Sequence, residues 1–111
     1  MAAALAKGFV NAGLVSTEEL IASDPAPAGR EAFGLEVGCE TTDSNADVLA
    51  KAKVIFLAFK PHQLDEATEA VRDQFDESHL VISILAGVRL AKLDAACGGH
   101  ARLVRVMPNT P

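Results

Sequence analysis

The feature that most constrains the fold is a set of short apolar runs, each ended by turn-forming residues. Residues 54–59 are apolar without any alternation, which is typical of a strand buried on both faces of a parallel sheet. Residues 80–85 and 103–107 predict two further strands of the same kind. Lys60-Pro61, Ala86-Gly87 and Pro108 stand where these three strands should end.

Helical patterns separate these strands along the chain. The segments with helical periodicity are residues 1–13, 26–33, 46–52, 63–75 and 90–96, and weaker strands are expected at 20–23 and 37–41. Gly13, Gly34 and Gly98 are placed to end three of the helices, and either Ser44 or Asn45 is suited to cap a fourth. Strands that alternate with helices predict an α/β fold with right-handed crossovers and a doubly wound, Rossmann-like parallel sheet. We expect residues 1–111 to form one such domain, with its sheet incomplete.

Charge and composition argue against several classes of partner. The chain carries 15 Asp and Glu against 10 Lys and Arg, a net charge of −5, with no basic run, so neither nucleic acid nor an anionic membrane is expected as a partner. The longest apolar run is far shorter than the roughly 20 residues that a bilayer requires. The two cysteines, Cys39 and Cys97, are far apart and predict reduced thiols in a cytoplasmic protein. We expect no metal site, because the histidines and cysteines do not cluster.

Candidate binding residues follow the predicted strands. Open α/β sheets bind ligands at the carboxyl ends of their strands, and the ends of parallel strands meet at one edge. The residues at these ends are Ser23, Asp24, Ala58, Phe59, Lys60, Pro61, Leu85, Ala86, Gly87, Asn109 and Thr110. Together they favour a dinucleotide site, although each signal alone is weak.

Several of these residues have two readings. Asp24 suits the hydroxyls of an adenosine ribose, but it is also a typical turn residue before Pro25. Arg30 would instead hold a 2′-phosphate, so the choice between NAD and NADP stays open. Lys60 would meet a phosphate or a substrate carboxylate, or simply be solvated. Gly87 would allow a flat ligand to approach, or serve an ordinary strand-to-helix turn.

Three segments carry a family resemblance. The segments Val54-Ile-Phe-Leu-Ala-Phe-Lys-Pro-His62, Leu80-Val-Ile-Ser-Ile-Leu-Ala-Gly-Val88 and Arg102-Leu-Val-Arg-Val-Met-Pro-Asn-Thr-Pro111 resemble strands and loops of pyrroline-5-carboxylate reductases. Phe59 stands in place of the valine usual in that family. The resemblance covers the whole chain and implies hydride transfer from NADPH or NADH to the C=N carbon of 1-pyrroline-5-carboxylate, which gives L-proline.

The resemblance also implies roles for individual residues. Ser23 and Asp24 would meet the adenosine ribose, and Asn45 would contact the cofactor. The residues that would line its ribose and nicotinamide are Ala58, Phe59, Lys60, Pro61, Leu85, Ala86 and Gly87. Asn109 and Thr110 would face the nicotinamide and the substrate. No residue is assigned a catalytic role, because the hydroxyl donor of that family lies in a carboxyl-terminal helical domain.

The resemblance further implies parts outside these residues. A strand with a Gly-rich pyrophosphate turn would precede Met1, and a dimerisation domain would follow, so the parent enzyme is expected to be a homo-oligomer acting on a small molecule. The chain alone is expected to be marginally stable and to have negligible turnover. The alternatives are another NAD(P)-dependent dehydrogenase, a deazaflavin-linked NADP reductase, or a non-catalytic nucleotide-binding module.

Overall fold

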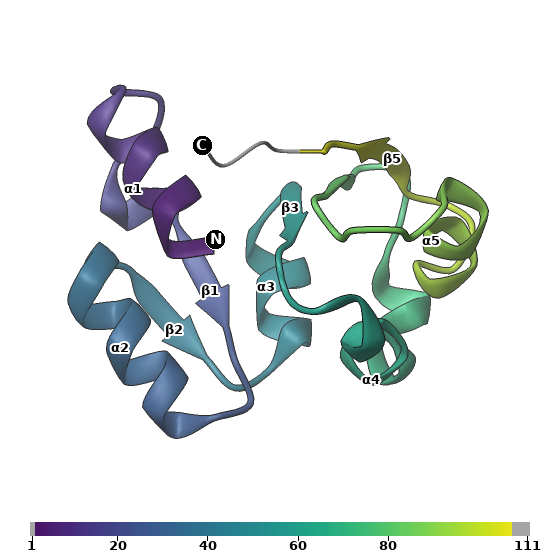
Figure 1. Ribbon diagram of the computed structural model, residues 1–111, viewed down its shortest axis with the longest axis horizontal. Helices are drawn as coiled ribbons and strands as arrows, with labels where there is room; N and C mark the ends of the chain where they lie inside the picture. The colour runs from purple at the N-terminus through teal and green to yellow at the C-terminus, as the bar shows by residue number, and fades with distance from the viewer. Residues whose placement is uncertain (1, 108–111) are drawn as a thin grey trace. The chain divides into compact units, whose positions relative to one another are not determined.

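The computed structural model describes residues 2–107 of the chain, drawn as a coloured ribbon in Figure 1. The chain divides after Ala52 into two compact units, Met1–Ala52 and Lys53–Pro111. Every strand pairing in both units is parallel. This arrangement confirms the α/β class and the parallel pairing that the alternating pattern predicts.

The first unit contains a two-stranded parallel sheet. Its elements are α1 (Ala2–Asn11), a 3₁₀ turn (Thr17–Glu19), β1 (Ile21–Ser23), α2 (Pro27–Val37), β2 (Glu40–Thr42) and α3 (Asn45–Lys51). Strand β1 pairs with β2 in a register that places Ser23 beside Thr42. Ala6, Val37 and Leu49 are the buried apolar residues of this unit. The pairing brings the carboxyl ends of β1 and β2 to the same edge (Figure 1).

Helix α2 is longer than its sequence pattern predicts. Gly34 lies inside the helix, and the helix ends at Gly38, whose φ of 81° is left-handed and whose N–H donates to the Gly34 carbonyl at 2.8 Å. The prediction that Gly34 ends the helix was wrong because a glycine is tolerated in a helix interior, whereas a left-handed cap requires one. Val37, expected in a strand, is buried in the last turn of α2, and β2 begins only at Glu40.

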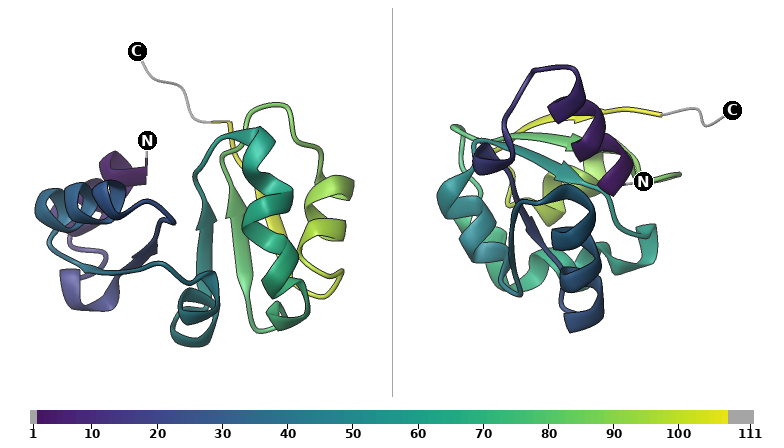
Figure 2. Two further views of the ribbon diagram at one scale, coloured as in Figure 1. Left: turned by 90° about the horizontal axis from the view of Figure 1, so that it is seen from below. Right: turned by 90° about the vertical axis from the view of Figure 1, so that its left-hand side faces the viewer.

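The second unit contains a three-stranded parallel sheet. Its elements are β3 (Val54–Leu57), a 3₁₀ turn (Pro61–Gln63), α4 (Leu64–Thr68), a 3₁₀ segment (Glu69–Gln74), β4 (Leu80–Ser83), α5 (Leu90–Ala96) and β5 (Arg102–Arg105). Strand β4 is central, with β3 and β5 on either side. Helices α4 and α5 contact each other and lie side by side in Figure 2. Their apolar sides are buried around Leu64 and Leu93.

Two predictions for this unit are corrected. Residues 54–59 are not buried on both faces, since Ile55 and Leu57 are buried while Val54 and Phe56 are 52% and 37% exposed. Burial of both faces requires cover on both sides of the sheet, and Val54 and Phe56 lie on the pleat opposite the buried residues. The helix expected at 63–75 is divided at Thr68, whose hydroxyl donates to the Leu64 carbonyl at 2.8 Å. Such back-bonding to the preceding turn bends helices.

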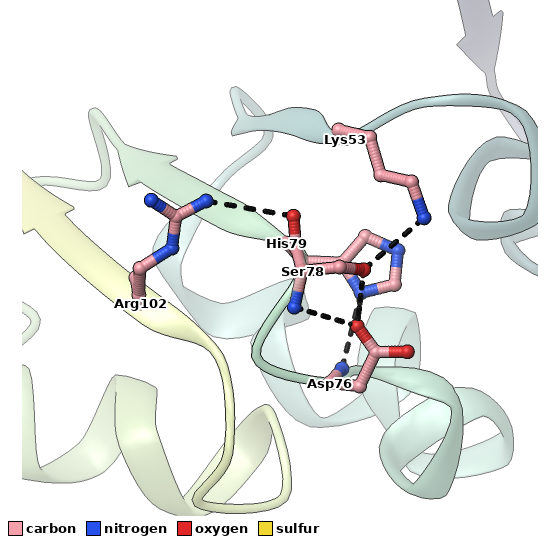
Figure 3. Close-up of polar contacts among 5 residues, drawn as sticks. All are labelled: Lys53, Asp76, Ser78, His79 and Arg102. Carbon is pink, nitrogen blue, oxygen red and sulfur yellow. Dashed lines mark hydrogen bonds and ion pairs between the residues drawn. The ribbon is translucent and has the colours of Figure 1, made fainter.

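A polar network fastens the amino ends of β3, β4 and β5 (Figure 3). Lys53 Nζ donates to the Ser78 hydroxyl at 3.1 Å, and Arg102 Nη2 donates to the Ser78 carbonyl at 3.5 Å. The Ser78 hydroxyl and N–H both donate to Asp76, which lowers the pKa of that carboxyl. His79 is 2% exposed, and its Nδ1 accepts the Asp76 N–H at 3.1 Å. The network lies at the edge opposite the strand ends that bind ligands in such sheets.

Candidate functional site

The carboxyl end of β1 brings two predicted cofactor residues into contact. Ser23 is the last residue of β1, and Asn45 is the first residue of α3. The Ser23 hydroxyl donates to Asn45 Oδ1, although the two residues are 22 positions apart. The contact forms because β1 and β2 are parallel and in register, so that the loop after β2 returns to the end of β1. A hydroxyl and an amide therefore lie together at the strand ends.

The loop after β2 is shaped by residues that sequence reasoning missed. The Thr42 hydroxyl donates to Asp47 Oδ2 at 2.6 Å and accepts the Ser44 N–H at 3.1 Å. These bonds hold the short turn between β2 and α3, and so set where Asn45 lies. The Thr-Asp-Ser-Asn-Ala-Asp sequence of residues 42–47, rich in side chains that bond to nearby backbone, is the signal that would have indicated this turn.

Asp24 is held against the first turn of α2. Its N–H donates to the Thr42 carbonyl at 3.1 Å, and its Oδ1 accepts the Ala26 N–H at 2.8 Å. A Cβ placed on Gly29 would lie only 2.2 Å from Asp24 Oδ2, so the carboxylate occupies space that only a glycine leaves open. Asp24 therefore acts as the turn residue before Pro25 that the sequence allows, and its carboxylate lies against the first turn of α2.

Arg30 extends from the same helix over the β1–α2 turn. Its Nη1 donates to the Asp24 carbonyl at 2.9 Å and to the Pro25 carbonyl at 3.2 Å. Both hydrogen bonds of its side chain within residues 2–107 start from Nη1, so Nε and Nη2 remain for an external acceptor. Arg30 is half-buried, and two backbone carbonyls fix its guanidinium, a group that suits recognition of a phosphate.

The residues after β3 lead into a short, hydrogen-bonded turn. Ala58 and Phe59 are half-buried, whereas Lys60 and Pro61 are exposed at the start of a 3₁₀ turn. The Lys60 N–H donates to Gln63 Oε1 at 3.1 Å, which orders this turn. The Lys60 side chain is thus carried on an ordered segment at the sheet edge.

The residues that follow β4 differ in their exposure to solvent. Leu85 is 1% exposed, and its N–H donates to the buried Ser83 hydroxyl at 3.2 Å, so its side chain belongs to the core. Ala86 and Gly87 are exposed, and a Cβ on Gly87 would meet no atom of the described residues within 4 Å. A flat group can therefore approach the backbone at Gly87. The other two predicted residues, Asn109 and Thr110, lie outside the described residues.

Within each unit, the strand ends carry groups that suit one part of a dinucleotide. Ser23, Asp24, Asn45 and Arg30 supply a hydroxyl, a carboxylate, an amide and a guanidinium, which suit ribose hydroxyls and phosphate. The open backbone at Gly87 suits an uncharged ring. In residues 2–107 no three His, Cys, Asp or Glu side chains come close enough to hold a metal ion, and no helix is long and apolar enough to cross a membrane.

Neither cysteine is poised for chemistry. Both Cys39 and Cys97 are free thiols. Burial raises the pKa of Cys97 to about 11, and burial also raises the pKa of Cys39. A thiol with a raised pKa is protonated at neutral pH and is a poor nucleophile.

Comparison with known proteins gives a consistent result. Residues 1–87 match the family model described as NADP oxidoreductase, coenzyme F420-dependent. The whole chain is 38% identical to pyrroline-5-carboxylate reductase 3 of Bos taurus and 35% identical to pyrroline-5-carboxylate reductase of Pseudomonas aeruginosa. The chain spans 36% and 40% of the lengths of these two relatives.

Solved structures agree with this match. A pyrroline-5-carboxylate reductase from Coxiella burnetii superposes with a TM-score of 0.85 at 30% identity, over 96% of this chain and 40% of that one. The pyrroline carboxylate reductase of Plasmodium falciparum, solved with NADP bound, superposes with a TM-score of 0.79 at 29% identity, over 97% of this chain and 38% of that one. These superpositions confirm the Rossmann-like class that the sequence pattern predicts.

Proposed function

Because this chain belongs to the family of coenzyme F420-dependent NADP oxidoreductases, we propose that it forms the NADP(H)-binding part of an enzyme that reduces 1-pyrroline-5-carboxylate to L-proline. The bound nicotinamide supplies a hydride, and the residues of this chain hold and orient the cofactor. NADP is also the cofactor in the superposed Plasmodium falciparum structure.

One observation carries the cofactor half of the proposal. Ser23 and Asn45 are in contact at the carboxyl end of a parallel strand pair, the position at which open α/β sheets bind nucleotides. In the proposal Ser23 and Asn45 hold the adenosine ribose, Asp24 meets it from the β1–α2 turn to which its carboxylate is bound, and Arg30 faces the 2′-phosphate.

The remaining site residues contact the nicotinamide half of the cofactor in this proposal. The segment Ala58, Phe59, Lys60 and Pro61 and the segment Leu85, Ala86 and Gly87 line its ribose and nicotinamide, with Leu85 acting through its backbone. Asn109 and Thr110 face the nicotinamide and the substrate. The proposal also includes a homo-oligomer, which the family resemblance implies. The net charge of −5 supports the absence of nucleic-acid partners, and the two free cysteines support a cytoplasmic location.

A cofactor titration tests the binding half. Calorimetric titration of the chain with NADPH is expected to give saturable binding, with Ser23→Ala and Asn45→Ala each weakening it by up to about tenfold, the usual effect of one lost hydrogen bond. The double variant should lose less than the sum of the two, because the residues contact each other. The matched control is Asn11→Ala, an exposed position at the end of α1. Equal affinity in all five proteins, the native chain and its four variants, would reject the proposed site.

A chimaera tests the catalytic half. Residues 1–111 replace the aligned segment of the Pseudomonas aeruginosa relative, and proline formation from 1-pyrroline-5-carboxylate and NADPH is measured. The chimaera should be active, and Asn45→Ala within it should raise the KM for NADPH. A folded chimaera that binds NADPH but forms no proline would contradict the proposed reaction.

The family description favours a second candidate function. A reductase linked to coenzyme F420 would exchange a hydride between that deazaflavin and NADP. The names of the relatives that match over the whole chain favour the first candidate. Oxidation of reduced coenzyme F420 with NADP by the same chimaera, without proline formation, would support the second candidate instead.

A further inference from the structure

We propose that Gly29 is a positioning residue for cofactor choice, which seats the Asp24 carboxylate on α2 so that the site accepts a ribose bearing a 2′-phosphate. This inference rests on the proposed function and deepens it. Nothing in the spacing of the sequence marks Gly29, which lies within the first turn of a helix. Its importance follows from the space its missing side chain leaves.

The Asp24 carboxylate occupies the space that the missing side chain of Gly29 leaves open. A Cβ at Gly29 would lie 2.2 Å from Asp24 Oδ2 and 2.8 Å from its Cγ, both closer than atoms approach without bonding. The overlapping atoms belong to a side chain rather than to backbone, so an alanine would displace the carboxylate and leave the helix in place. Gly34, in the same helix, meets only Thr41 Cγ2 at an ordinary 3.8 Å. The two glycines of α2 therefore differ in whether a Cβ would meet the Asp24 carboxylate.

In this position the Asp24 carboxylate also accepts a hydrogen bond from the backbone of the β1–α2 turn. Pro25 and Pro27 carry no N–H, so Ala26 supplies the single backbone donor of residues 25–27. Asp24 Oδ1 accepts that N–H at 2.8 Å. Because the carboxylate accepts the Ala26 N–H and lies near the positive end of an 11-residue helix, its charge is partly offset there.

Compensation of this charge decides which ribose is favoured. A displaced, uncompensated carboxylate at the end of β1 would accept hydrogen bonds from a 2′-hydroxyl, but it would repel a 2′-phosphate. When the Asp24 carboxylate is bound to the turn, the charge nearest to a 2′-phosphate is the Arg30 guanidinium. The Asp24 and Pro25 carbonyls hold this guanidinium in place. We therefore expect the native chain to favour NADPH over NADH, and Gly29→Ala to reverse or reduce that preference.

The test compares dissociation constants for NADPH and NADH. Gly29→Ala is expected to lower the preference for NADPH by about tenfold, which corresponds to about 1.4 kcal/mol. Gly34→Ala is the matched control and should leave the ratio unchanged. Asp24→Asn combined with Gly29→Ala should restore the ratio toward that of Asp24→Asn alone, because the charge that causes the repulsion is gone.

A second measurement is independent of cofactor. Loss of the hydrogen bond to Asp24 should speed hydrogen exchange of the Ala26 amide in Gly29→Ala and not in Gly34→Ala. Unchanged exchange, or an unchanged ratio in a protein that binds both cofactors, would overturn the inference while leaving the proposed function intact. Failure of the native chain to bind either cofactor would overturn both.

Discussion

Replacement of Gly98 by alanine should destabilise the second unit more than the same change at its neighbour. Gly98 and Gly99 follow α5 with similar left-handed φ values of 78° and 81°. A Cβ on Gly98 would lie 2.6 Å from the Arg72 backbone carbonyl oxygen, whereas a Cβ on Gly99 would meet no described atom within 4 Å. The pair thus separates the cost of the backbone conformation from the cost of the clash.

The magnitudes follow from these two contributions. A left-handed conformation costs a residue other than glycine about 1–2 kcal/mol, and this applies to both positions. Overlap with a backbone atom in a packed region adds about 1–3 kcal/mol at Gly98 alone. We expect Gly99→Ala to lower the free energy of unfolding by about 1–2 kcal/mol and Gly98→Ala by about 2–5 kcal/mol. The larger loss is a sizeable part of the roughly 5–15 kcal/mol that stabilises a typical domain.

Urea unfolding followed by circular dichroism measures both values, provided that the dependence on urea is the same in each variant. If the two variants lose equal stability, the close approach of Gly98 to the Arg72 carbonyl is not as described, and the reasoning fails. A more stable Gly98→Ala variant would exclude the left-handed conformation as well.

Three further predictions concern single groups. Hydrogen bonds from Ser78 lower the folded-state pKa of Asp76, so the contribution of this carboxylate to stability is present above the ordinary carboxyl pKa and is lost as the pH falls through the lowered pKa. Asp76→Asn should therefore destabilise the chain at neutral pH and have the same stability as the native chain in acid. Urea unfolding midpoints measured across pH test this. Iodoacetamide at neutral pH should label half-buried Cys39 before Cys97, whose pKa burial raises to about 11, and mass spectrometry that finds Cys97 modified first in folded protein would contradict this order. Ser83→Ala should cost about 1–2 kcal/mol in thermal or urea unfolding, because it removes the acceptor of a buried backbone N–H, and a neutral effect would count against that bond.

Local patterns predicted most of the elements correctly. The helix at residues 90–96 has the bounds that its periodicity predicts. Each expected strand is present but shorter, and β2 and β5 are also shifted along the chain. Errors arose where tertiary context outweighs local preference. Gly34 carries the same composition signal as Gly38, and only the backbone conformation tells a helix interior from a cap. Burial on one face of β3 likewise depends on which side helices cover.

The candidate site was predictable to a similar degree. The position of Ser23 and Asp24 at a strand end indicates them as site residues, whereas only the family resemblance indicates Asn45. The mutual arrangement of these residues was not indicated, because the contact between Ser23 and Asn45 depends on the register of two parallel strands. The role of Gly29 depends on a distance of 2.2 Å between a hypothetical Cβ and one carboxylate oxygen, which no spacing in the sequence encodes.

The most direct test of the central claim is an amide chemical-shift map of the ¹⁵N-labelled chain titrated with NADPH. Binding at the carboxyl ends of the parallel strands should shift saturably the amides of residues 23–30, 42–47 and 86–88, while those of the polar network at residues 76–79 stay unchanged. Shifts confined to residues 76–79, or no saturable shifts at all, would contradict the assignment of a cofactor site to these strand ends.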